Sequence, residues 1–178
     1  MTDYRRTKIS GACYFFTVNC NLRLNNNILI ENIDSLRYSF RKTKHRHPFQ
    51  IDAIVILPEH IHCILTLPKD DFDYAKRWSL IKSEFSRMIP KNEKISQSRL
   101  KRGERGIWQR RFWEHLIRNE KDYSRHVDYI HWNPVKHGHV KRVSDWPYSS
   151  FHQFVKRGEY SRDWGWNNID EKEYGEMR

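Results

Sequence analysis

The segment LPEHIHCILTLP, residues 57–68, places His60 and His62 two residues apart in an otherwise apolar run. On a β-strand, residues i and i+2 point to the same face of the sheet, so both imidazoles are expected to lie side by side. Ile61 and Cys63 would then point to the opposite face. Two neutral imidazoles on a rigid strand suit a divalent metal, and a pair of hydrogen-bonded buried histidines is the alternative.

Strand and helix patterns alternate on both sides of this run. Residues rich in β-formers predict strands over 11–20, 49–58, 60–68 and 107–117. Apolar residues at helical spacing predict helices over 28–43, 71–90 and 120–133, and those of the second are Trp78, Ile81, Phe85 and Met88. The segment 91–106 has no periodicity and is predicted to be a loop or flexible excursion. This order predicts an α+β fold with helices packed on a mostly antiparallel sheet.

The helix predicted over 120–133 has faces of different character. Asn119 is its expected N-cap and Pro134 its expected end. At about 100° per residue, the helix gathers one apolar stripe from Tyr123, Val127 and Ile130. This stripe is expected to pack on the sheet.

Tyr129 and Asn133 lie one turn apart on another side of that helix, as do Asp122 and His126. Taken alone, Tyr129 would be interpreted as a surface tyrosine, and Asn133 with Pro134 as a pair that ends the helix. Opposite a histidine pair, the Asn133 amide oxygen can be a third metal ligand and the Tyr129 phenol a nucleophile for a bound phosphate. A phosphotyrosine ester keeps the energy of the cleaved bond, so such an enzyme can rejoin strands.

The composition points to a polyanionic partner. The chain has 33 Lys and Arg against 22 Asp and Glu, a formal net charge of +11, which favours nucleic acid first and a membrane surface second. Long apolar runs and a signal-peptide core are absent from the sequence, so membrane insertion and secretion are not expected. Cys13, Cys20 and Cys63 lack metal-binding spacing and fit a reducing cytoplasm.

A basic and aromatic segment precedes the last predicted helix. From Arg99 to Arg118, both included, there are seven Lys or Arg residues, interleaved with Trp108, Phe112 and Trp113. Basic side chains bind phosphates and aromatic faces stack on unpaired bases, although aromatic residues that alternate into the core are the simpler alternative. We expect a mixture of the two. The residues expected to bind DNA are Arg5, Arg6, Arg110 and Arg111.

These motifs together resemble a known family. EHIHCIL resembles the HUH motif, and HVDYIHWNPVKHG (126–138) resembles the tyrosine-helix motif of REP-associated tyrosine transposases, which are relatives of the single-tyrosine insertion-sequence transposases. YRR near the start, FFTVN, RFWEHLIRN and VSDWPYSSFH are similar to the same family. The resemblance covers residues 4–158.

The resemblance implies a ferredoxin-like HUH nuclease fold and cleavage of single-stranded DNA at hairpins of repetitive extragenic palindromes (REP). By motif position, His60 and His62 bind the metal, Mg²⁺ or Mn²⁺, and Tyr129 is the nucleophile that forms a 5′-phosphotyrosine intermediate. Related enzymes commonly have a Gln one turn after the tyrosine as a third ligand, and Asn133 occupies that position here. Glu59 could help to orient the metal, but a solvated turn carboxylate is the simpler expectation.

The expected organisation is a single transposase domain over 1–158 and an acidic tail over 159–178. The tail has six acidic and three basic residues and could cover the DNA groove or be a mobile end. We expect a monomer or weak dimer in the cytoplasm, associated with the nucleoid and not with a membrane. Two other functions fit parts of the sequence: a hairpin-binding protein that does not cut, and a metal hydrolase that uses water without a covalent intermediate.

Overall fold

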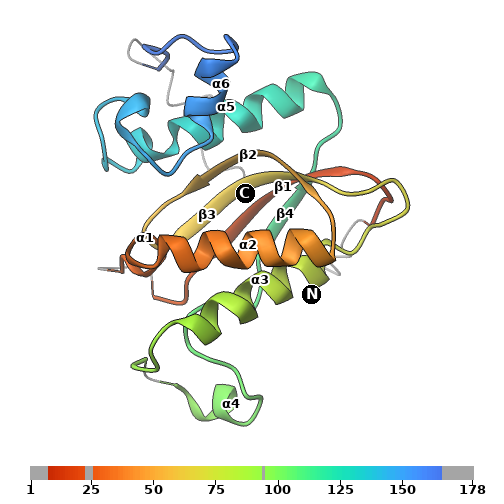
Figure 1. The fold of residues 1–178 in the computed structure, drawn as a ribbon, viewed down its shortest axis with the longest axis vertical. Coiled ribbons are helices and arrows are strands. Elements are labelled where there is room, and N and C mark those ends of the chain that lie inside the picture. The colour runs from red at the N-terminus through yellow and green to blue at the C-terminus, as the bar shows by residue number, and fades with distance from the viewer. Residues whose placement is uncertain (1–7, 23–25, 94, 166–178) are drawn as a thin grey trace, which may run out of the picture.

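A four-stranded antiparallel sheet forms the centre of the computed structural model, which describes residues 8–22, 26–93 and 95–165 (Figure 1). The strands are β1 (Cys13–Asn19), β2 (Gln50–Ile56), β3 (His60–Thr66) and β4 (Trp113–Leu116). Their order is β2-β3-β1-β4, so the strand with the histidine pair is central. Arg5 and Arg6 lie outside the described residues.

Helices cover both faces of this sheet (Figure 1). One face carries α1 (Ile28–Glu31), α2 (Ile33–Arg46) and α3 (Tyr74–Met88). The other carries α5 (Glu120–Lys136), η1 (Val143–Asp145) and α6 (Phe151–Lys156). A four-residue helix, α4 (Gln97–Leu100), lies in the segment between α3 and β4. The predicted α+β fold with an antiparallel sheet is therefore confirmed.

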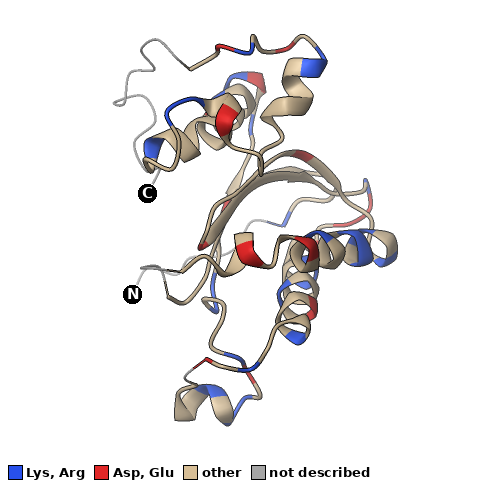
Figure 2. Cartoon of the chain, turned by 60° about the vertical axis from the view of Figure 1, so that its left-hand side comes forward, with Lys and Arg blue, Asp and Glu red and all other residues tan. Residues whose placement is uncertain are grey.

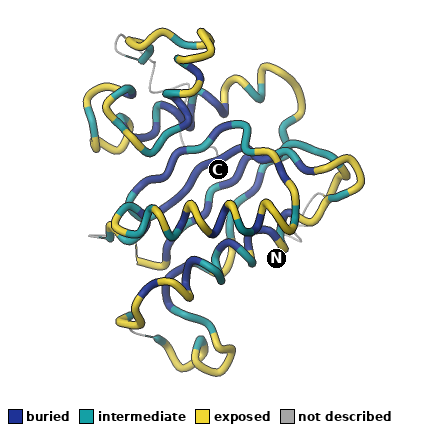
Figure 3. The backbone as a smooth tube through the Cα atoms, in the orientation of Figure 1, coloured by how far each residue is buried: buried dark blue, intermediate teal, exposed yellow. Residues whose placement is uncertain are grey.

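Alternation along the strands separates two apolar layers. Tyr14 and Phe16 of β1 point toward α2 and α3, whereas Phe15 points toward α5. The predicted α3 side chains Trp78, Ile81 and Phe85 are buried in the first layer, but Met88 is 37% exposed because the helix ends there. Figure 3 shows the buried strands between helices whose outer surfaces are exposed.

The helix predicted over 28–43 is broken at Asn32. This residue has φ −116° and ψ 35°, and its Nδ2 donates a hydrogen bond to the carbonyl oxygen of Ile28 at 2.9 Å. An asparagine side chain that bonds to the nearby backbone competes with regular helix geometry. The pattern therefore forms two helices, α1 and α2.

The strand predicted over 107–117 is also shorter in the structure. Residues 113–116 form β4 and pair with β1, whereas Trp108 makes an isolated antiparallel bridge to Cys20. The chain turns between these two parts, and Ile107 and Trp108 are buried in the apolar layer on the α3 side. Lys82 of α3 holds this turn by donating to the carbonyl oxygen of Gln109 at 2.9 Å. Both tryptophans pack in apolar layers: Trp108 is buried on the α3 side, and Trp113 lies against Phe15 on the α5 side.

Helix α5 begins where predicted but ends later. The Asn119 side chain accepts a hydrogen bond from the backbone N–H of Asp122 at 2.9 Å, which confirms the N-cap. Pro134 lies inside the helix and does not end it. Proline removes one backbone hydrogen bond, but the helix closes one turn later, where His137 N–H donates to Asn133 O at 3.0 Å. Asn133 is therefore an interior helical residue.

The described part of 91–106 folds back on the end of α3 instead of extending as a loose excursion. Arg105 organises it by donating to the Glu93 carboxylate, to Ile89 O at 2.8 Å and to Pro90 O at 2.7 Å. The hydrogen bond and charge of Arg105 lower the pKa of Glu93 to about 2. Periodicity does not reveal a half-buried guanidinium that orders a loop, which is why the ordered conformation of this segment was not predicted.

The start of the predicted acidic tail packs on α5 and α6. The rings of Tyr160 and Trp164 lie 5.3 Å and 6.4 Å from the ring of buried His131, and the Tyr160 hydroxyl donates to Asp128. Residues 166–178 lie outside the described part. Within the described ranges, none of the helices has the length and apolar character needed to cross a membrane.

Candidate active site

His60 and His62 lie side by side on the face of β3 that α5 covers. Their ring centroids are 4.7 Å apart and the rings are nearly perpendicular, at 83°. Both side chains are buried, while Ile61 and Cys63 belong to the apolar layer on the other side of the sheet. The predicted alternation of this strand is confirmed.

Each histidine is oriented through its Nδ1 atom. His60 Nδ1 lies 2.9 Å from Glu59 Oε1, and because an ionised carboxylate only accepts, Nδ1 carries the proton. His62 Nδ1 lies 2.9 Å from the Thr17 hydroxyl on the adjacent strand β1. Neighbours of this kind orient metal-ligating histidines in many proteins, with Nε2 facing the metal.

Glu59 is more than a solvated turn carboxylate, contrary to our expectation. Burial acts to raise its pKa, but the hydrogen bond and charge of His60 outweigh burial and lower the pKa below its ordinary value. The ionised carboxylate therefore holds the His60 ring in one orientation.

Helix α5 places Tyr129 against the histidine pair. The Tyr129 ring centroid lies 5.2 Å from that of His62 and 5.9 Å from that of Phe15, and the side chain is 8% exposed. Lys136, two turns later, has its Nζ 4.9 Å from the Tyr129 ring centroid. The phenol ring of Tyr129, the candidate nucleophile from the sequence, therefore contacts the imidazole ring of His62.

Asn133 is buried one turn after Tyr129. Its Nδ2 lies 3.5 Å from the Tyr129 carbonyl oxygen. Its Oδ1 is buried, and within residues 8–22, 26–93 and 95–165 it has no hydrogen-bond partner. Leaving a buried acceptor unpaired costs about 1–3 kcal/mol, so such atoms are uncommon outside functional sites. A carboxamide oxygen and two imidazole nitrogens form a donor set that fits a divalent metal.

The structure adds residues to the site that the sequence analysis missed. Asn19 of β1 is paired in register with His60, and its buried Oδ1 likewise has no hydrogen-bond partner among the described residues. His137, just after the end of α5, has its ring centroid 5.2 Å from that of His60. Burial and the nearby His60 lower the pKa of His137. Helical spacing from Asn133 would have indicated His137, had Pro134 not been taken as the end of the helix.

The two described arginines expected to bind DNA lie just before β4. Arg110 is exposed and forms an ion pair with Glu104 at 2.7 Å, and its Nη2 lies 3.0 Å from Ser98 Oγ. Arg111 is also exposed. Figure 2 shows further Lys and Arg positions along α2, α3 and the α4 segment. The positive charge is therefore spread over the surface and is not confined to the histidine site.

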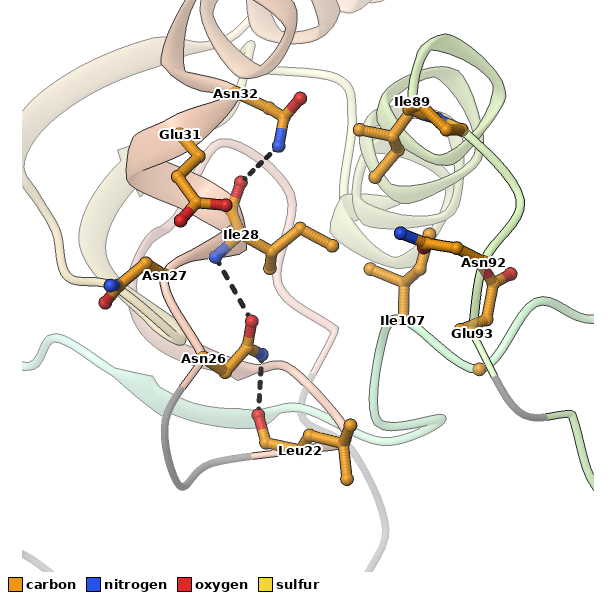
Figure 4. A pocket seen from close by; sticks show the side chains of 12 residues that line it. Leu22, Asn26, Asn27, Ile28, Glu31, Asn32, Ile89, Asn92, Glu93 and Ile107 are labelled. Carbon is orange, nitrogen blue, oxygen red and sulfur yellow. Dashed lines mark hydrogen bonds between the residues drawn. The ribbon is translucent and has the colours of Figure 1, made fainter.

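A pocket of about 380 Å³ opens between α1 and the end of α3 (Figure 4). The Asn26 side chain in this pocket already bonds to the backbone on both sides. Its Oδ1 accepts a hydrogen bond from Ile28 N–H at 3.1 Å, and its Nδ2 donates one to Leu22 O at 2.7 Å. None of the histidines, nor Tyr129 or Asn133, lines this pocket. It is therefore separate from the candidate active site.

Comparisons with known proteins agree with this arrangement. Residues 14–133 match the family described as IS200-like transposases. The chain is 48% identical to a putative REP-associated tyrosine transposase of Haemophilus influenzae, over 94% of this chain and 95% of that one. It is also 48% identical to a REP-associated tyrosine transposase of Escherichia coli, over 96% and 94%. A solved structure of a REP-associated tyrosine transposase bound to a REP hairpin is similar at a TM-score of 0.79, with 46% identity and 96% of both chains covered.

Proposed function

Because this chain belongs to the REP-associated tyrosine transposases, within the IS200-like transposase family, we propose that it cuts and rejoins single-stranded DNA at REP hairpins through a covalent bond to Tyr129. The observation that carries this assignment is the contact of the Tyr129 ring with His62 of the paired histidines. The hairpin partner is supported by the similar structure, which contains one.

The proposed metal ligands are His60, His62 and Asn133, and the proposed ion is Mg²⁺ or Mn²⁺. The unpartnered Oδ1 of Asn133 and the oriented imidazoles support this set. When bound, the ion would polarise the scissile phosphate and neutralise its charge. The mixed nitrogen and oxygen donors suit Mn²⁺, and the hard phosphate oxygens suit both ions.

The role of the protein is to hold the phenol against a phosphate in line for attack. As the bond from Tyr129 Oη to phosphorus forms, the phenol loses its proton, the bond from phosphorus to the 3′ oxygen breaks and that oxygen takes up a proton. The reverse reaction rejoins a strand without an external energy source. Holding both groups on rigid elements makes this attack effectively intramolecular.

Arg110 and Arg111, together with Arg5 and Arg6, are proposed to bind DNA phosphates. Both described arginines are exposed and precede the edge strand β4. His60, His62, Tyr129 and Asn133 come from one chain, which supports action as a monomer or weak dimer. A DNA substrate favours work in the cytoplasm at the nucleoid.

The test is trapping of the covalent adduct. A REP hairpin with a single-stranded flank is incubated with the protein and Mg²⁺ or Mn²⁺, and the products are resolved on a denaturing gel. Wild type should form a protein–DNA adduct that mass spectrometry places on Tyr129. Tyr129→Phe should bind the hairpin and form none. Tyr123→Phe, which alters the apolar stripe six residues earlier, is the matched control and should retain cleavage.

Other outcomes would identify the other functions. A phosphonucleotide on any other residue would refute the assignment of Tyr129. Nicking by Tyr129→Phe would indicate a hydrolase that uses water. A wild-type protein that binds but never nicks would be a hairpin-binding protein.

A further inference from the structure

Two histidines and an aspartate outside the proposed active site form a second cluster between β4 and the start of α5. His115 comes from β4, and Asp122 and His126 lie one turn apart on α5. One potential ligand atom from each residue lies within 4.8 Å of the other two. Only residues 117–119 separate the strand from the helix. The cluster therefore joins an edge strand to the helix that carries Tyr129.

The aspartate lies between the two imidazoles. His115 Nε2 is 2.9 Å from Asp122 Oδ2, and His126 Nδ1 is 3.1 Å from Asp122 Oδ1. The backbone N–H of Arg118 donates to Asp122 Oδ2 at 3.0 Å, which fixes the carboxylate. The two imidazole rings are stacked, with centroids 4.6 Å apart and an interplanar angle of 17°. All three side chains are thus held in place by their neighbours.

His126 has a ring nitrogen without a hydrogen-bond partner in the described part of the chain. The side chain is 1% exposed, and its Nε2 is buried without a hydrogen-bond partner. Its Nδ1 lies 2.7 Å from the carbonyl oxygen of Asp122, an atom that only accepts, so Nδ1 carries the proton and Nε2 the lone pair. A backbone carbonyl on one ring nitrogen is a common orientation for a histidine that ligates a metal through the other.

This cluster is distinct from the histidine pair on β3. The Phe15 ring lies between them, with its centroid 4.7 Å from the His126 ring and 5.6 Å from the His62 ring. His115 and Asp122 remain 24% and 20% exposed, so an ion can enter from solvent and keep water ligands. Two imidazoles and one carboxylate favour first-row transition metals over Mg²⁺, because imidazole is a softer donor than oxygen.

We propose that His115, Asp122 and His126 bind a transition-metal ion, Zn²⁺ foremost, at a site separate from the active site. Bound there, the ion would cross-link β4 to the first two turns of α5. Tyr129 follows His126 by three residues on the same helix, so the site fixes the helix near its nucleophile. The proposal does not depend on DNA cleavage.

The test measures Zn²⁺ binding where the active-site histidines are missing. Full-length His60→Ala/His62→Ala protein, stripped with EDTA, is titrated with Zn²⁺ by calorimetry and with Co²⁺ by visible absorption. We expect about one ion per chain and a higher melting temperature in Zn²⁺, since binding to the folded state stabilises it. Adding His115→Ala and His126→Ala should abolish both effects.

Two further variants guard against trivial results. Asp122→Asn keeps the size of the side chain, so it should fold and bind Zn²⁺ at least about tenfold more weakly. His45→Ala/His47→Ala removes two histidines at the end of α2, on the other side of the sheet, and should leave binding unchanged. The proposal fails if the His60→Ala/His62→Ala protein binds no Zn²⁺, or if binding survives the loss of His115 and His126. Neither result bears on the adduct at Tyr129.

Discussion

Asn133 is fully buried, yet its carboxamide oxygen has no hydrogen-bond partner among the residues that the structure describes. A residue selected for stability alone would pair this atom or be apolar, because an unpaired buried acceptor lowers the free energy of unfolding. Its position one turn after Tyr129 explains the exception if the oxygen serves a metal. Stability and activity should therefore respond to substitution in opposite directions.

We expect Asn133→Leu to lose cleavage without losing stability. Leucine has a similar shape and removes an unpaired amide, so the free energy of unfolding in EDTA should stay level or rise by about 1 kcal/mol. Urea denaturation and the adduct assay measure the two effects. Asn32→Leu is the control: the Asn32 amide bonds Ile28 O, so this variant should be less stable and still cleave. Marked destabilisation by Asn133→Leu would instead give the amide a structural role.

The shared strand face of His60 and His62 could be predicted because strand periodicity is a local property of the sequence. That Tyr129 lies opposite them was expected from the chemistry of the set and from the family resemblance, since no local pattern brings α5 onto β3. The contributions of Thr17 and Asn19 could not be predicted, since they depend on the register between β1 and β3, strands more than forty residues apart in the chain. Glu59 was adjacent in sequence, but its role depends on a turn that points the carboxylate back at His60.

At the scale of elements, the predicted boundaries failed where side chains override local preference. Pro134 predicts a helix end, but the loss of one backbone bond in the last turn is tolerated, and α5 continues to Lys136. Asn32 is a weaker sequence signal for a helix end than Pro134. Its side-chain hydrogen bond to Ile28 O nevertheless divides the first predicted helix into α1 and α2. Such contacts depend on side chains and on the tertiary structure. The sequence therefore predicted which segments are helices and strands, but not where several of them end.

Arg105 organises the segment between α3 and β4, and its loss should loosen that segment alone. Arg105→Ala removes bonds to Glu93, Ile89 O and Pro90 O. We expect faster amide hydrogen exchange in 91–106 and unchanged exchange in β1 and β3. Arg102→Ala, in the same segment and exposed, is the control. Slow exchange in the Arg105→Ala segment would show that backbone contacts suffice to order it.

For the whole molecule, the net charge of +11 predicts salt-dependent DNA binding. Hairpin affinity should fall steeply with salt, and Arg110→Ala/Arg111→Ala should reduce the slope of log K against log salt by about 1.5. Fluorescence anisotropy over a salt series measures this slope. Arg37→Ala/Arg41→Ala makes the same change in charge on exposed positions of α2. Equal reductions from both pairs would mean that long-range charge, and not contact at Arg110 and Arg111, drives binding.

The α5–α6 side of the molecule should be sensitive to acid. Burial lowers the pKa of His131 from 6.5 to about 3, so the unfolded chain takes up this proton first as pH falls. The neutral histidine therefore supports full stability above pH 6.5, and stability declines between pH 6.5 and 3 by up to about 1.4 kcal/mol per pH unit. His131→Phe should flatten this decline in urea denaturation at several pH values, whereas His45→Gln, exposed on α2, should not. If the free energy of unfolding of His131→Phe falls with pH as steeply as that of the wild type, other groups cause the acid sensitivity.

The order of the chain also matters during its synthesis. The histidine pair lies on β3, and the tyrosine follows only after α3, the α4 segment and β4. The ribosome therefore releases the two histidines proposed to bind the metal well before Tyr129, the proposed nucleophile. Tyr129 can meet them only when α5 docks on a sheet whose edge strand β4 immediately precedes it. By the proposed route, DNA cleavage requires a chain that is complete through α5, so we expect translation products that end before Tyr129 to lack it.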